Sequence, residues 1–225
     1  FVNDLVGITA RRELPSLFRE GGYRWSGNRY ELQFKCLNMK DVTAFFKPGL
    51  FVDNNSSGRL RIDSGGRLDA EISSRRLAIG EQYLRNLRLT FDNANGKLNG
   101  KLSCEDINLN AVQLKDNTIS LFAEADNIGV GFRSDGDGDG KASGGIYARG
   151  KLSRRDEGPL DMAVDILPSG FNIGEATWSI MPATVKFNGP DLKVDRLRIT
   201  SGEQEILIDG GMAKEKNDTL SVRLE

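Results

Sequence analysis

The stretch ISLFAEADNIGVGF, residues 119–132, places an apolar side chain at every second position of two successive runs. The alternating residues are Ile119, Leu121 and Ala123, followed by Ile128, Val130 and Phe132. Successive side chains of a strand point to opposite faces of a sheet, so this period predicts two strands that share one apolar face.

The same period extends outward from this stretch in both directions. Turn signals separate the runs at NSSG (55–58), SGG (64–66), NANG (93–96), KDN (115–117), NGPD (188–191) and KEKND (214–218). Short links of this kind join antiparallel neighbours. The pattern predicts a mainly β protein, a long antiparallel meander of hairpins with about fifteen strands.

The segment SDGDGDGK, residues 134–141, follows the second run directly. Asp135, Asp137 and Asp139 alternate as in the first half of an EF-hand loop, but position twelve is Ile146 instead of a carboxylate. Strand-like runs flank the segment where an EF-hand has helices. We therefore favour a solvated loop, with these three aspartates as a weak calcium site.

Two short helices are expected within the first fifty residues. ELPSLFREGG (13–22) has Pro15 near a helix start, and NMKDVTAFFKPG (38–49) has Asn38 as a cap and Pro48 near its end. Each is too short to be stable alone, so each is expected to lay an apolar side on the sheet. We treat 1–225 as one β-rich domain, with a helix-containing entry segment (1–50) and a β region (51–225).

Composition excludes several functions. The 31 basic and 32 acidic residues give a net charge of −1 without a basic block, which argues against nucleic acid. The chain has no histidine, which removes Ser-His-Asp and Cys-His catalysis and the usual zinc sites, and no cofactor is expected. Cys36 and Cys104 lie in strand-like runs, and we favour two buried free thiols, although the sequence leaves their pairing open. An enzyme is the least favoured class.

Alternation leaves two architectures open. A sheet of this many strands curls or divides into layers, so the apolar face lies either inside a two-sheet sandwich or along the inside of a curled trough. The aliphatic composition, with only two Trp and four Tyr, leans slightly toward the trough.

Three segments of the last third carry a family resemblance. They are FNIGEATWSIMPATVKFNG (171–189), DLKVDRLRITSGEQEILIDGGM (191–212) and KNDTLSVRLE (216–225). With them, residues 160–225 resemble the repeats of TamB-like translocation and assembly module proteins, relatives of the AsmA-like bridge proteins of the bacterial envelope. NMKDVTAFFKPGL (38–50) followed by SSGRLRI (56–62) looks like the helix and strand pair of that family.

The resemblance implies a trough of the β-taco type and a place in the periplasm. The parent protein would be anchored in the inner membrane and would reach an outer-membrane β-barrel assembly partner, and this chain would be a piece of it that joins neighbouring segments. The implied task is phospholipid transport between membranes, outer-membrane protein assembly, or both. Phospholipid acyl chains would then contact the inward residues Leu89, Leu102, Leu109, Leu121, Val130 and Val164.

Two other functions stay open. The first is a structural or interaction module that pairs through its sheet edges. The second is a β-sandwich that binds calcium through the acidic loop or sugar through Tyr23, Trp25 and Tyr30, although these aromatic residues are better explained as closing one end of the core.

Overall fold

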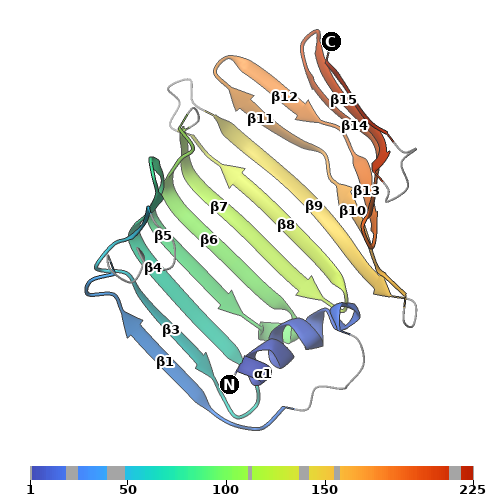
Figure 1. Ribbon diagram of the computed structural model, residues 1–225. Coiled ribbons are helices and arrows are strands. Elements are labelled where there is room, and N and C mark those ends of the chain that lie inside the picture. The colour runs from blue at the N-terminus through green and yellow to red at the C-terminus, as the bar shows by residue number, and fades with distance from the viewer. Residues whose placement is uncertain are drawn as a thin grey trace.

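The structure is a computed structural model that describes residues 2–18, 25–39, 49–110, 113–136, 142–154, 158–212 and 219–224. Its strands form one antiparallel sheet of sixteen strands, which confirms the mainly β antiparallel fold (Figure 1). All of these strands belong to the same sheet, so the described residues do not form a two-sheet sandwich.

The strands are β1 (Tyr30–Lys35), β2 (Leu50–Val52), β3 (Ser57–Ile62), β4 (Leu68–Ile79), β5 (Gln82–Asp92), β6 (Leu98–Asn108), β7 (Gln113–Glu124), β8 (Asn127–Ser134), β9 (Ser143–Arg154), β10 (Leu160–Ile166), β11 (Ser169–Ile173), β12 (Ala176–Ile180), β13 (Ala183–Asn188), β14 (Asp191–Ser201), β15 (Gln204–Met212) and β16 (Leu220–Leu224).

The strands follow one another across the sheet in chain order. β2 and β3 both pair with β4, β10 and β11 both pair with β9, and β13 and β12 both pair with β14. Each of these couples is therefore one long strand interrupted in its middle, in two cases at a proline, Pro168 or Pro182. Proline lacks the N–H that a continuous ladder requires. The result is a simple meander of hairpins.

Several longer strands are also irregular near their middle. Asn86 in β5 and Asp116 in β7 have φ values of 50°, in the left-handed region that Asn and Asp tolerate better than most residues. Ladder pairing lapses at both residues. The KDN signal at 115–117 was thus wrongly predicted to be a turn, because it lies inside β7.

The N-terminal segment is helical upstream of the predicted position. α1 (Val2–Val6) continues into a π-helical turn, Gly7–Arg11. In the described part of the predicted 13–22 helix, Pro15–Leu17 form a 3-10 turn, and residues 19–22 lie outside the described residues. Leu5 and Ile8 pack on the sheet, and this tertiary contact stabilises a segment whose central glycine lowers its intrinsic helix propensity. Residues 40–48 of the other predicted helix lie outside the described residues.

The helical segment lies across the hairpin ends of the sheet (Figure 1). Ile8 forms a buried cluster with Ile62 and Leu68, which flank the β3–β4 turn. Farther along, the Asp126 N–H donates to the Glu13 carbonyl oxygen, and the Ser16 hydroxyl donates to the Asp126 carboxylate at 2.9 Å. The helical segment therefore covers one end of the sheet.

Candidate functional site

The sheet has one face composed of apolar side chains, which we call the apolar face. One row of cross-strand partners crosses it from β4 to β9 and consists of Ile72, Leu89, Leu102, Ile119, Phe132 and Ile146. The parallel row contains Ala70, Phe91, Gly100, Leu121, Val130 and Ala148. One residue farther along, the opposite face carries Ser73, Arg88, Ser103, Thr118 and Arg133. The sheet is therefore two-sided.

The apolar face is accessible to solvent. Ile119 is 37% exposed, Ile146 is 42% exposed and Val130 is 45% exposed. Side chains of this kind in a sealed core would be almost fully buried. The exposed apolar area thus extends over the consecutive strands β7, β8 and β9.

A line of buried side chains crosses the sheet next to the row that runs from Ile72 to Ile146. We call this line the buried row. It consists of Cys36, Ser56, Ser74, Leu87, Cys104, Asn117 and Ser134. The Cys36 N–H donates to the Ser56 carbonyl oxygen, and the Ser56 hydroxyl donates to that of Ser74 at 2.7 Å. Cross-strand pairing continues the row from Cys104 through Asn117 to Ser134. Cys36 and Cys104 are both free thiols, separated by the intervening strands.

The apolar side chains continue on the far side of the buried row, but there they occupy the alternate positions of each strand. In β6 the apolar positions change from Leu102 and Cys104 to Ile107, and Ile107 pairs with Leu84 and Leu114 of the neighbouring strands. Residues from both sides of the line pack in one cluster around Leu87, Cys104 and Ile107. The apolar face therefore extends over both halves of the strands.

A buried ionic group accompanies this shift. Asp106 is 2% exposed and forms ion pairs with Arg85 and Lys115, its cross-strand neighbours on β5 and β7; the Lys115 Nζ lies 3.4 Å from the carboxylate. A buried carboxylate needs such partners to offset its lost hydration. Burial, and secondarily the charge of Asp106, raises the pKa of the Cys104 thiol to about 11.

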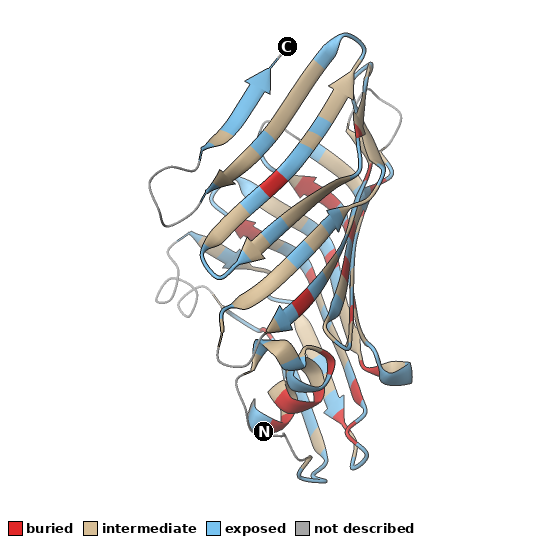
Figure 2. Ribbon diagram, turned by 90° about the vertical axis from the view of Figure 1, so that its right-hand side faces the viewer, coloured by how far each residue is buried: buried red, intermediate tan, exposed pale blue. Residues whose placement is uncertain are grey.

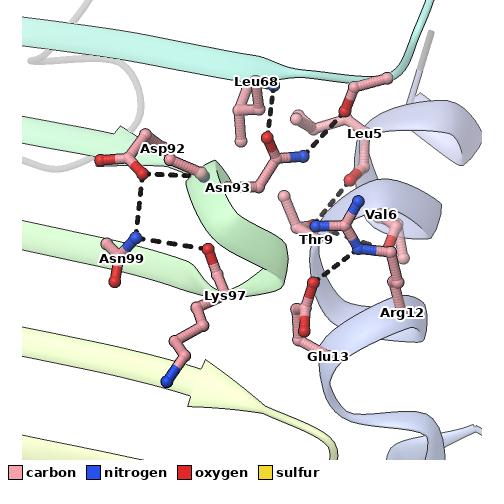
Figure 3. Close-up of polar contacts among 12 residues, drawn as sticks. Leu5, Val6, Thr9, Arg12, Glu13, Leu68, Asp92, Asn93, Lys97 and Asn99 are labelled. Atoms are coloured by element: carbon pink, nitrogen blue, oxygen red, sulfur yellow. Dashed lines mark hydrogen bonds and ion pairs between the residues drawn. The ribbon is translucent and has the colours of Figure 1, made fainter.

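One end of the apolar face is closed by the helical segment, shown in Figure 3. Asn93 is buried at the β5–β6 turn, where its Oδ1 accepts from the Leu68 N–H and its Nδ2 donates to the Gly66 carbonyl oxygen, both at 2.8 Å. Thr9 in turn donates to the Leu5 carbonyl oxygen at 2.6 Å. The Asn93 bonds join the β5–β6 turn to the β3–β4 turn, and the Thr9 bond lies within the helical segment.

The structure places the predicted acyl-contacting residues as follows. Leu89 pairs with Leu102, and Leu121 pairs with Val130, all on the apolar face. Val164 lies on the same face, opposite Gly150.

Leu109 lies apart from the others, just beyond the end of β6. It is half-exposed and lines a small apolar hollow of ≈ 160 Å³ with Leu77, Ile79 and Leu84. Further members of the rows, Ile72, Ile119, Phe132 and Ile146, were not selected from the sequence, although the same alternation identifies them.

The structure does not describe a calcium site. Asp135 accepts from the Arg133 guanidinium at 2.6 Å, and this hydrogen bond, followed by the charge of Asp135, raises the pKa of Arg133. Asp137 and Asp139 lie outside the described residues. Within the described ranges, no group of three or more metal-ligating side chains is present.

The aromatic residues weighed for sugar binding serve packing where they are described. Trp25 and Tyr30 meet edge to face, with ring centroids 6.4 Å apart, and both pack against the Ile8 cluster. The Tyr30 hydroxyl donates to Asp4 at 2.6 Å, and the Trp25 indole N–H donates to the Ser64 carbonyl oxygen. Tyr23 lies outside the described residues.

Comparison of the chain with protein-family models, curated proteins and solved structures gives no match. Within the described part of the chain, no helix combines the length and apolarity needed to cross a bilayer. The structure alone thus defines the class: a single antiparallel sheet with one polar face and one open apolar face.

Proposed function

We propose that the sheet forms a trough whose apolar face holds the acyl chains of phospholipids. In this proposal the chain is a segment of a bacterial envelope protein, located in the periplasm, anchored in the inner membrane through other parts of the protein and connected to an outer-membrane β-barrel partner. It contributes to phospholipid transport, outer-membrane protein assembly, or both. The exposed apolar rows are the observation that carries the proposal.

The dimensions of the rows suit an acyl chain. Neighbouring strands lie about 4.8 Å apart, so the row from Ile72 on β4 to Ile146 on β9 extends about 24 Å. One leaflet of a bilayer has about 15 Å of hydrocarbon, half of the 30 Å core. A complete acyl chain therefore fits along one row.

The chemistry of the rows suits a ligand without specific polar contacts. Aliphatic side chains dominate both rows, and burial against them gains about 0.8 kcal/mol for each methylene of the ligand. On the opposite face, ion pairs such as Arg88–Glu71 and Arg59–Asp69 present charge to water. Such a sheet separates an apolar path from its solvent, and the task requires no catalytic step.

Curvature supports the trough. The sheet is curved in Figure 2, and the buried row and the proline breaks provide a line along which it can bend. Apolar residues on both sides of the buried row pack in one cluster, as residues on the inside of such a bend would.

Photocrosslinking from adjacent residues of β7 tests the proposal. A photoreactive amino acid at Leu121 lies on the apolar face, and one at Ser120 lies on the opposite face and serves as the matched control. Phospholipid adducts in cells from position 121 and not from position 120 would support the proposal. Equal labelling at both positions, or none at either, would refute it for this part of the sheet.

A further inference from the structure

β1 is an edge strand with no described neighbour on its outer side (Figure 1). It pairs with β3 along its whole length, and its side chains from Glu31 to Lys35 are exposed. Leu32 is 48% exposed and Phe34 is 50% exposed, and both lie on the apolar face. β1 contains no proline or bulge, devices that keep edge strands from pairing with other chains.

We propose that β1 pairs antiparallel with β1 of a second copy of this chain. Such pairing joins the two sheets about a two-fold axis, the commonest symmetry of protein oligomers. The sequence of β1 fits this partner in its backbone, its charges and its apolar residues.

The backbone determines which residues meet the partner. The Cys36 N–H donates to the Ser56 carbonyl oxygen, so the even-numbered residues before it direct their backbone groups toward β3. The backbone groups of Glu31, Gln33 and Lys35 then point away from the sheet, because alternate residues of an antiparallel strand bond on opposite sides. These three residues form the ladder with the second copy.

The charges favour one register. With Gln33 opposite the partner's Gln33, Glu31 lies opposite the partner's Lys35, and this pair occurs twice by symmetry. Opposite charges facing across strands are favourable. Another register pairs the same outward groups but places Leu32 opposite the partner's Leu32. Lys35 then lies opposite the partner's Arg29, and the two positive charges repel.

The apolar residues fit the same register. Leu32 lies opposite the partner's Phe34, again twice, and both are on the apolar face of their sheets. The two apolar faces therefore become continuous across the seam. Within its own chain Glu31 accepts a hydrogen bond from the Gln33 side chain at 3.2 Å, and its other oxygen lies 3.9 Å from Arg61. Both contacts are long and exposed, so they compete weakly with a partner's Lys35.

Proline substitution at the two edges of the sheet tests the proposal. A single strand pair is a small interface, so we expect a reversible, concentration-dependent dimer with twice the 24.8 kDa mass of the chain in sedimentation experiments. Gln33→Pro removes an outward N–H and abolishes the dimer. Val222→Pro is the matched control on β16: the Gly211 N–H donates to the Thr219 carbonyl oxygen, so alternation points the Val222 N–H outward at the other edge. This variant retains the dimer.

A charge exchange tests the register. Glu31→Lys places a positive charge opposite the partner's Lys35 and weakens dimerisation at least tenfold, while the double variant E31K/K35E restores the opposite charges and the dimer. The double variant keeps Lys at position 31, so its recovery excludes an effect confined to the contact with Arg61. Circular dichroism checks that each variant is folded.

A wild-type chain that stays monomeric up to its solubility limit would overturn the proposal. Loss of the dimer in Val222→Pro with retention in Gln33→Pro would do the same, because it would locate the contact at β16. Lipid crosslinking from position 121 depends on neither outcome, so the two proposals fail separately.

Discussion

Alanine substitution of two isoleucines on the apolar face can compare a covered part of that face with an exposed part. Ile62 is 0% exposed beneath the helical segment, and Ile72, on the neighbouring strand, is 36% exposed. Ile62→Ala removes three buried carbons, which costs about 2.4 kcal/mol in transfer free energy. The cavity left behind increases the total loss to about 3–4 kcal/mol.

Ile72→Ala is expected to cost much less. About two thirds of the transfer free energy applies, and an open surface leaves no closed cavity, so the loss is about 1.5 kcal/mol. Both substitutions replace the same residue within a strand, so the change in strand propensity cancels to a first approximation.

Urea denaturation followed by circular dichroism measures both losses, with an unchanged m-value as the check that the compactness of neither state has altered. We expect the free energies of unfolding of the two variants to differ by about 2 kcal/mol. Equal losses would show that Ile72 is covered as completely as Ile62, and would refute the reasoning that the apolar face is open.

Three further predictions concern the buried polar groups. Asp106→Asn removes the negative charge that pairs with Arg85 and Lys115, and it should lower the free energy of unfolding by about 3 kcal/mol. A loss below about 1 kcal/mol in urea titration would show that the Asp106 carboxylate is solvated. The Cys104 thiol has a pKa of about 11 against an ordinary 9.0, so its thiolate is about 100-fold scarcer near pH 8. Alkylation of Cys104 in the native chain should therefore be slower by at least that factor than in the unfolded chain. Equal alkylation rates, measured by mass spectrometry, would contradict the burial of Cys104. Asn93→Ala leaves the Leu68 N–H and the Gly66 carbonyl oxygen without partners and should cost about 1–3 kcal/mol. Hydrogen exchange should rise first at the Leu68 N–H, and an unchanged exchange rate there would rule out this role.

Alternation was sufficient to predict the antiparallel meander and the apolar side of most strands. Leu121 and Val130, chosen from the sequence alone, are direct cross-strand partners. A period of two is a local property, and short hairpin links leave few ways to arrange its strands. These features therefore follow from neighbouring residues.

The buried row was not predicted, because its signal resembles a strand boundary. The apolar positions of β6 change from even-numbered residues up to Cys104 to odd-numbered residues from Ile107. The polar KDN segment follows at 115–117, so a turn was predicted inside β7. The irregularities of β5, β6 and β7 lie side by side, so the three strands stay paired on both sides of the buried row. This alignment between neighbours cannot be recognised from any one strand. The N-terminal helix was missed for a related reason, since contact with the hairpin ends stabilises it.

The strict chain order of the strands has a consequence for how such a protein can change its length. Each hairpin pairs only with the hairpins before and after it, as in repeat proteins, where stability is approximately a sum of units and their contacts. Removal of β5 and β6 together would bring β4 against β7, still antiparallel and with the apolar side retained. Removal of β5 alone would make its neighbours parallel. Evolution can therefore lengthen or shorten this sheet by whole hairpins, whereas steps of one strand would disrupt it.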